Sequence, residues 1–157
     1  MDGDLRVRHC RAGAEELAAI VAINRASATC AYAPIFGDAP YPEDGVRRRY
    51  TRLLADPEVS VLLVDGVGYA AARPGHVEAL YVVPDAWGTG VADELYARIA
   101  EVAGIPATLW VLEANARGRH FWERRGWRPT GERDESGRPE LQYRISDDSY
   151  ARQSSNE

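Results

Sequence analysis

Residues 77–102 have the sequence V-E-A-L-Y-V-V-P-D-A-W-G-T-G-V-A-D-E-L-Y-A-R-I-A-E-V, and this stretch decides the fold. It begins with an apolar, β-prone run, Val77 to Val83, which predicts a strand buried on both faces. Pro84 and Asp85 end the strand, because proline cannot donate to a β-ladder and aspartate favours turns.

The spacing of the apolar residues changes from a strand period to a helical period after Gly88 and Gly90. The apolar residues that follow share one face of a predicted helix: Val91, Leu95, Ile99 and Val102. The order strand, glycine turn, helix N-terminus gathers free backbone N–H groups and the positive end of a helix dipole at one point. This junction favours the binding of an anionic phosphate.

The glycine turn differs from two common phosphate-binding motifs. It is not a P-loop, because the chain contains no lysine. It departs from the dinucleotide fingerprint, because Asp93 stands where a third small residue is needed. The turn resembles motif A of the GNAT superfamily of N-acetyltransferases, (Q/R)-x-x-G-x-(G/A), with Trp87, Gly90 and Ala92 at its first, fourth and sixth places. Trp87 departs from the usual Gln or Arg. The resemblance implies that backbone N–H groups of the turn hold the pyrophosphate of acetyl-CoA.

A second block, Leu109 to Trp127, reads L-W-V-L-E-A-N-A-R-G-R-H-F-W-E-R-R-G-W and is similar to the strand–helix unit of the same family, L-x-V-x-x-x-N-x-x-A-x-x-F-Y-E-x-x-G-F. The matches in place or in kind include Asn115, Phe121, Glu123, Gly126 and Trp127. Trp122 replaces the family's tyrosine, and Gly118 replaces its alanine. For either block taken alone, the alternative is an ordinary βα unit in an α/β core.

Composition limits the class of protein. The 157 residues predict one domain over residues 1–146, followed by a polar tail over 147–157. The formal charge of −5 argues against binding to nucleic acid or to an anionic membrane, and weakly favours a cationic amine substrate. No apolar signal segment, transmembrane run or metal-ligand spacing is present. Cys10 and Cys30 form no disulfide framework, which indicates reduced thiols in a cytoplasmic protein.

The chain in order predicts a succession of short elements: a strand at 5–10, a helix at 13–24, a loop rich in aromatic residues at 27–42, a helix at 43–54, a hairpin of strands 59–64 and 67–72, the strand at 77–83, the helix that begins after Gly90, a strand at 107–112, a helix at 116–125, and a closing antiparallel pair at 127–131 and 140–146. The aromatic loop either covers a sheet edge or forms a lid over a pocket. In the family this region helps to form the acceptor site. Arg47 to Arg49 predict a solvated helix face rather than an anion site.

We therefore predict an α/β fold with a GNAT-like central mixed, mostly antiparallel β-sheet and helices on both faces. The strands that begin at Val77 and Ala107 should form one parallel pair, because a helix crosses between them. The resemblance implies that this pair of strands splays apart and that CoA enters the gap between them. It also implies that this protein can form a homodimer, as members of the family often do. It also implies these cofactor-binding residues: Tyr81, Val82, Val83, Trp87, Gly88, Thr89, Gly90, Val91, Ala92 and Asn115.

Acetyl transfer to an amine needs a base, because an alkylamine with a pKa of about 10.4 is almost fully protonated at neutral pH. Glu78 is the first candidate, and the resemblance implies that it acts through a water. The alternative is a rim carboxylate or a salt-bridge partner. His76 lies two residues earlier in the same strand, so it faces the same side and is a second candidate base.

Trp122 is the main departure from the family, because the tyrosine at this place is the usual candidate to protonate the departing CoA sulfur. An indole N–H can donate a hydrogen bond but does not give up its proton. The loss is tolerable, because a thiolate is already a fair leaving group. Two functions therefore stay open: an N-acetyltransferase that works by direct transfer in a ternary complex, and a non-catalytic acyl-CoA or small-molecule binding protein. Polyamines, amino-sugar antibiotics, amino acids, peptide N-termini and protein lysines are all candidate acceptors.

Overall fold

The computed structural model describes residues 6–10, 13–30 and 40–147, with side chains to residue 28 in the second range. The strands of the described residues form a seven-stranded sheet with the order β1-β2-β3-β4-β5-β7-β6. The pairing is mostly antiparallel, and β4 and β5 form the parallel pair. The predicted α/β fold class is therefore confirmed.

The chain forms two compact units. The first comprises Met1–Arg73 and Glu78–Val102, and the second comprises Pro74–Val77 and Ala103–Glu157. The single domain expected over residues 1–146 stays a prediction. Of the expected polar tail, only Asp147 lies within the described residues.

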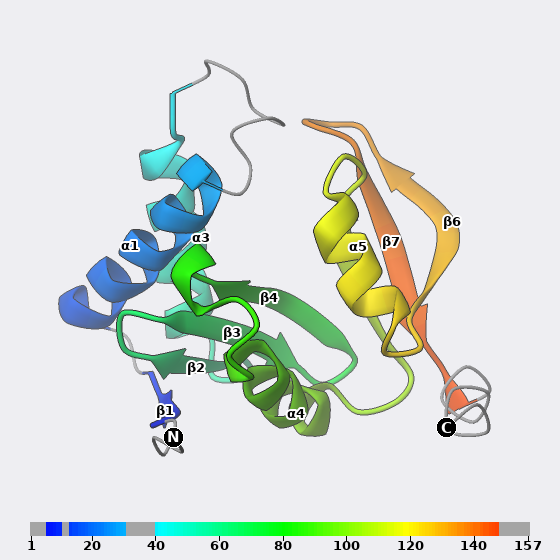
Figure 1. Cartoon of the computed structure of the whole chain (residues 1–157), viewed down its shortest axis with the longest axis horizontal. Coiled ribbons are helices and arrows are strands. Elements are labelled where there is room, and N and C mark those ends of the chain that lie inside the picture. Colours follow the sequence, from blue (N-terminus) through cyan, green and yellow to red (C-terminus); the bar gives the residue numbers. More distant parts are fainter. Residues whose placement is uncertain (1–5, 11–12, 31–39, 148–157) are drawn as a thin grey trace. The chain divides into compact units, whose positions relative to one another are not determined.

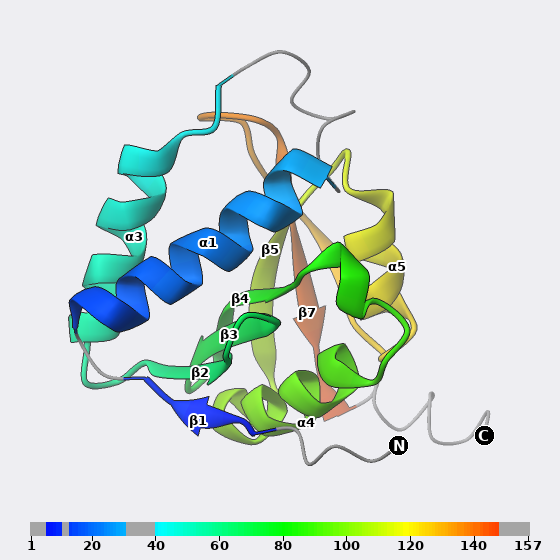
Figure 2. The same cartoon turned by 60° about the vertical axis from the view of Figure 1, so that its left-hand side comes forward.

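The first unit contains most of the helices. Its elements are β1 (Arg8–His9), α1 (Ala14–Cys30), α3 (Glu43–Ala55), β2 (Ser60–Val64), β3 (Gly68–Arg73), most of β4 (His76–Val82), the 3₁₀ turn η1 (Pro84–Ala86) and nearly all of α4 (Val91–Ala103). Helices α1 and α3 lie side by side on one face of β2 and β3, and α4 lies on the opposite face (Figures 1 and 2).

Strand β2 is buried on both faces, as expected for a strand between two helical layers. Val61 and Leu63 pack into the core beneath α1 and α3, and the alternate residues Leu62 and Val64 are also buried. The turn after β2 confirms the predicted hairpin, because Gly66 takes a left-handed φ of +72° that favours glycine.

Helix α1 is longer than the sequence predicted. The predicted helix stopped at Asn24, whereas α1 continues to Cys30 through Ala26 and Ala28. Alanine has the highest helix propensity, and no glycine or proline interrupts this segment. The aromatic loop expected from Ser27 is therefore helical at its start, and residues 31–39 lie outside the described residues. The first strand is shorter than expected, with two residues in β1.

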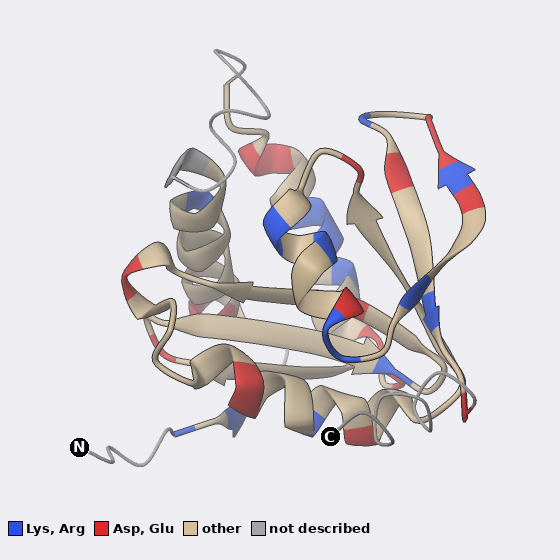
Figure 3. Cartoon of the chain, turned by 45° about the vertical axis from the view of Figure 1, so that its right-hand side comes forward, with Lys and Arg blue, Asp and Glu red and all other residues tan. Residues whose placement is uncertain are grey.

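The second unit contains β5 (Ala107–Leu112), α5 (Ala116–Glu123), β6 (Arg128–Asp134) and β7 (Glu140–Ile145). Strand β5 pairs with β7 over its whole length, from Ala107↔Ile145 to Leu112↔Glu140. The start of β4 also belongs to this unit and pairs with β5 at His76↔Thr108. Strand β6 is exposed throughout, and arginines and acidic residues are interspersed along it (Figure 3).

Candidate functional site

The glycine turn of the first unit adopts a backbone that other residues rarely adopt. Gly88 has φ +77° and Gly90 has φ +92°, both in the left-handed region. Both glycines are exposed, and a Cβ built on either would meet nothing within 4 Å. The glycines are therefore explained by backbone conformation and not by close packing, and the surface above them is open to a ligand.

The turn also presents unused hydrogen-bond donors at the start of α4. Within the part of the chain that the structure describes, the backbone N–H groups of Gly88, Gly90, Val91 and Ala92 have no acceptor. The first donor of the helix ladder after them is Glu94 N–H, 3.1 Å from Gly90 O. These donors and the helix dipole favour an anion at this point.

Trp87 fixes the turn to the end of β4. Its indole Nε1 donates to Val82 O at 3.1 Å, and the Ser27 hydroxyl is 3.4 Å from the same carbonyl. The N–H of Val83 donates to Val67 O at 2.8 Å. The indole of Trp87, where the family usually has Gln or Arg, therefore has a structural role, and 37% of this residue is exposed.

Glu78, the predicted base, is held by two arginines of the first unit. Arg73 Nε donates to Glu78 Oε1 at 3.1 Å, and Arg73 Nη2 donates to Asp56 Oδ2 at the same distance. Arg49 Nη2 lies 3.9 Å from Glu78 Oε2 and donates to the backbone carbonyl of Glu78 at 2.6 Å. The side chain of Glu78 is 17% exposed. The alternative role, a salt-bridge partner, is therefore real, and the lone pairs not used by Arg73 can still accept from water.

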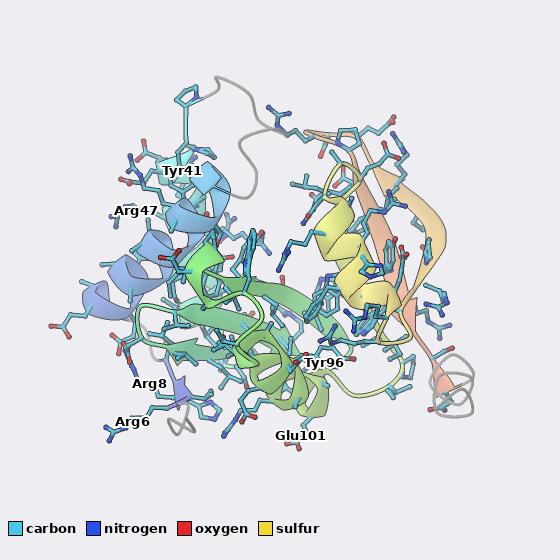
Figure 4. All side chains as sticks on the ribbon, in the orientation of Figure 1. Arg6, Arg8, Tyr41, Arg47, Tyr96 and Glu101 are labelled. Carbon is cyan, nitrogen blue, oxygen red and sulfur yellow. The ribbon has the colours of Figure 1, made fainter. Side chains whose placement is uncertain are left out.

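A chain of hydrogen bonds links three tyrosines of the first unit through Asn24. Tyr41 O–H donates to Asn24 Oδ1 at 2.5 Å, Asn24 Nδ2 donates to Tyr69 O–H at 2.9 Å, and Tyr69 O–H donates to Tyr50 O–H at 2.7 Å. Tyr81 stacks on Tyr69 with ring centroids 5.4 Å apart. These residues come from α1, α3, β3, β4 and the segment before α3, and Figure 4 labels Tyr41. Sequence reasoning missed the chain, because no spacing in the sequence connects its members.

Burial controls the protonation of these tyrosines. It raises the pKa of Tyr41 to about 12, with Glu43 and Tyr81 adding to the effect and Arg25 opposing it. Burial also raises the pKa of Tyr50 and of Tyr69. The hydroxyl groups therefore stay protonated at neutral pH, and they act as hydrogen-bonding groups rather than as charges.

His76, the second candidate base, belongs to the second unit. Its Nδ1 lies 2.9 Å from Thr108 Oγ1, so the imidazole is linked to β5. Asn115 is the N-cap of α5, and its Oδ1 accepts from Gly118 N–H at 3.0 Å. A Cβ at Gly118 would clash with the Asn115 side-chain amide, so a larger residue here requires that side chain to shift.

Trp122 lies within an aromatic cluster of the second unit. It is 7% exposed, and its ring contacts Phe121 and Trp127 edge-on, with centroids 5.0 and 5.6 Å away. Next to it on α5, Glu123 accepts from Tyr143 O–H at 2.5 Å, and that hydroxyl accepts from Arg119 Nε at 3.2 Å. The Tyr143 hydroxyl therefore uses its proton in the hydrogen bond to Glu123.

Two further features contain none of the predicted site residues. A hollow of about 470 Å³ in the second unit is lined by His120, Glu123, Arg124, Arg128 and Pro129. Cys10 packs against the core of the first unit, and burial raises the pKa of its thiol to about 11. The side chain of Cys30 lies outside the described residues.

Within the described residues, no group of His, Cys, Asp or Glu could hold a metal ion. No helix in the same ranges is long and apolar enough to cross a membrane.

The chain belongs to the GNAT acetyltransferase family, because the profile of the Acetyltransferase (GNAT) family matches residues 20–127. Solved structures agree in fold. Apo YjaB from Escherichia coli has a TM-score of 0.69 and 24% identity, over 89% of this chain and 96% of that one. A GCN5-related N-acetyltransferase from Rhodopseudomonas palustris has a TM-score of 0.68 and 21% identity, over 92% of this chain and 96% of that one.

The PaiA N-acetyltransferase from Thermoplasma acidophilum, solved with coenzyme A, has a TM-score of 0.64 and 15% identity, over 89% of this chain and 99% of that one. At these identities the solved structures show the fold alone. No curated protein sequence matches the chain. Family membership supports acetyl transfer as the general activity.

Proposed function

We propose that this protein is an N-acetyltransferase that moves the acetyl group of acetyl-CoA directly to a primary amine in a ternary complex. The observation that carries the proposal is the glycine turn at the N-terminus of α4. Its open surface and the free N–H groups of Gly88, Gly90, Val91 and Ala92 suit the pyrophosphate of a CoA thioester. The family match and the coenzyme A bound to the Thermoplasma protein support the same ligand.

Residues on either side of this turn are also proposed to contact acetyl-CoA. Thr89 completes the turn, and its hydroxyl donates to Ala86 O. Tyr81, Val82 and Val83 would contact the pantetheine arm through the backbone groups that Trp87, Ser27 and Val67 do not already use. Acetyl-CoA supplies the activated acetyl group, and the protein supplies orientation and proton transfer.

In the proposed reaction, Glu78 removes a proton from the amine through a water, and Arg73 holds the carboxylate in one orientation. The free amine nitrogen forms the new C–N bond as the C–S bond breaks, CoA leaves as a thiolate, and the second proton of the nitrogen passes to solvent. Trp122 donates no proton in this scheme. A thiol with a pKa near 8.5 needs little help to leave at neutral pH, so the reaction tolerates a missing acid.

A second candidate, a binding protein without turnover, rests on Trp122, because this place lacks the tyrosine of the family pattern. A screen separates the two functions. Amines of the open acceptor classes are incubated with acetyl-CoA, and free CoA is followed with a thiol reagent against blanks that lack protein or amine. Amine-dependent release of CoA supports the enzyme. Tight binding of acetyl-CoA with no release for any amine supports the binding protein.

A further inference from the structure

Arg49 differs from the other arginines of its run on α3. The sequence predicted a solvated face for Arg47 to Arg49, and Arg47 fits that description, with an exposed ion pair to Glu43 on the same helix. Arg49 instead reaches β4 and donates to the backbone carbonyl of Glu78 at 2.6 Å. Its guanidinium also lies over the ring of Tyr50, with Cζ 5.5 Å from the ring centroid.

The guanidinium of Arg49 is held in place but not fully used. Its one hydrogen bond to the described residues is the bond to the Glu78 carbonyl, and 46% of its side chain is exposed. An arginine fixed by an aromatic ring and a carbonyl has lost much of its freedom before any ligand arrives. The remaining N–H donors form a planar fork that matches a carboxylate.

The neighbouring charges leave Arg49 without a hydrogen-bonded carboxylate. Arg73 lies between Glu78 and Asp56 and donates to each of them at 3.1 Å. The Glu78 carboxylate is 3.9 Å from Arg49, beyond hydrogen-bond distance. Of the two arginines, Arg49 therefore has the less compensated charge, and it lies beside the proposed base.

We propose that Arg49 binds a carboxylate of the acceptor, so that the acceptor class is an amine with a neighbouring carboxylate, such as an α-amino acid. The inference rests on the proposed function, because it assigns the substrate class of the same site. A single carbon separates the amine and the carboxylate of an α-amino acid. A carboxylate on Arg49 would therefore hold the amine beside Glu78, whose own carboxylate is only 3.9 Å from that guanidinium.

The test compares three acceptors with one side chain: an α-amino acid, its methyl ester and its decarboxylated amine. The amine of the ester has a lower pKa than that of the amino acid, and the decarboxylated amine has a higher one. A preference for the amino acid over both cannot therefore come from amine basicity. We expect the wild-type protein to prefer the amino acid in kcat/KM by about tenfold to a hundredfold, the range of a hydrogen bond to a charged group.

Arg49→Gln should abolish this preference, mainly through a higher KM for the amino acid, and Arg49→Lys should keep part of it. Arg48→Gln is the matched control, because Arg48 is an exposed neighbour on the same helix, and it should keep the full preference. Melting curves of the variants check folding. Loss of acetyl-CoA affinity in Arg49→Gln, with the preference retained, would instead assign Arg49 to a CoA phosphate and overturn the inference.

A binding measurement separates the failure of this inference from the failure of the proposed function. Calorimetry follows titration of the free amino acid into the protein saturated with CoA. Binding to wild type that is lost in Arg49→Gln supports the inference even without turnover. If another amine is acetylated while no amino acid binds or reacts, the acetyltransferase stands and the role of Arg49 is wrong.

Discussion

Arg73 holds Glu78 and Asp56 at once, with 3.1 Å between its guanidinium nitrogens and one oxygen of each carboxylate. The same guanidinium lies 3.8 Å from Glu58, whose side chain is 74% exposed. Glu78 is therefore oriented by the segment between α3 and β2 as well as by its own strand. A base that acts through a water benefits from this fixed orientation, because proton transfer depends on geometry before it depends on basicity.

Glu78→Gln should lower kcat by about 10²-fold or more, because the amide cannot accept the proton of the amine. The acidic limb of the pH–rate profile should move or disappear, and the affinity for acetyl-CoA should stay within about twofold. Glu58→Gln is the matched control, since it removes a more exposed carboxylate from the same arginine. Steady-state kinetics on the best acceptor measure both variants.

An unchanged pH profile in Glu78→Gln would remove Glu78 from the mechanism. The proton would then go to His76, to a chain of waters, or to solvent from the small fraction of free amine. His76→Gln distinguishes the first of these from the others, because it should then reproduce the loss of kcat.

Gly90→Val should weaken acetyl-CoA binding by at least about tenfold, because a β-branched side chain fills the approach to the N–H groups and opposes φ +92°. Gly131→Val is the control, since Gly131 has φ +95° and open space around it on strand β6. Both variants carry similar backbone strain, of about 1–2 kcal/mol. Equal acetyl-CoA affinities in calorimetry would show that the turn holds no phosphate.

Gly68→Ala should destabilise the protein by about 1–3 kcal/mol, because it overpacks the contact between β3, β4 and α4. A Cβ at this position would lie 2.9 Å from the backbone oxygen of Tyr81, which cannot move without distorting β4, and 3.1 Å from Leu95. Gly45→Ala on α3 is the control, because its nearest neighbour is the end of the Arg48 side chain at 3.8 Å. The free energy of unfolding of this variant, measured in urea, should rise by up to about 1 kcal/mol, because alanine has a higher helix propensity than glycine.

Cys10 should react slowly with iodoacetamide at neutral pH. Burial disfavours the thiolate and raises the pKa from 9.0 to about 11, so the reactive fraction falls about a hundredfold at any pH below both values. In the folded Cys30→Ser variant, the labelling rate should keep rising with pH until about pH 11. In urea, the rate should level off near the ordinary thiol pKa of 9.0. Fast labelling at pH 7 would instead show that the Cys10 thiol is accessible and reactive.

The sequence could predict the elements whose signals are local. The hairpin at Gly66 and the turn at Gly88 and Gly90 follow from residues that are adjacent in the chain, and the structure has both. The surroundings of Glu78 could not be predicted in the same way. Arg49 is 29 residues away from it, and the length of an arginine side chain allows a solvated face and a contact to β4 equally well.

Trp122 provides the last test, through two variants that both remove the buried indole. Trp122→Tyr and Trp122→Phe leave similar space beside Phe121 and Trp127, so each should lose about 1–3 kcal/mol of stability and the two should lose similar amounts. They differ by one hydroxyl group. If this position meets the departing sulfur, the tyrosine restores an acid, and kcat should exceed that of the phenylalanine variant by no more than the ~10²–10⁴ of a positioned acid.

Kinetics of wild type and both variants on the best acceptor decide the role of Trp122. Robust turnover by wild type excludes a protein that only binds acyl-CoA. If the Trp122→Phe variant has the same kcat as wild type, the indole N–H gives the sulfur no useful hydrogen bond. If the Trp122→Tyr and Trp122→Phe variants have equal kcat, Trp122 has only a packing role in the core, consistent with its 7% exposure. The leaving thiolate would then be protonated by solvent.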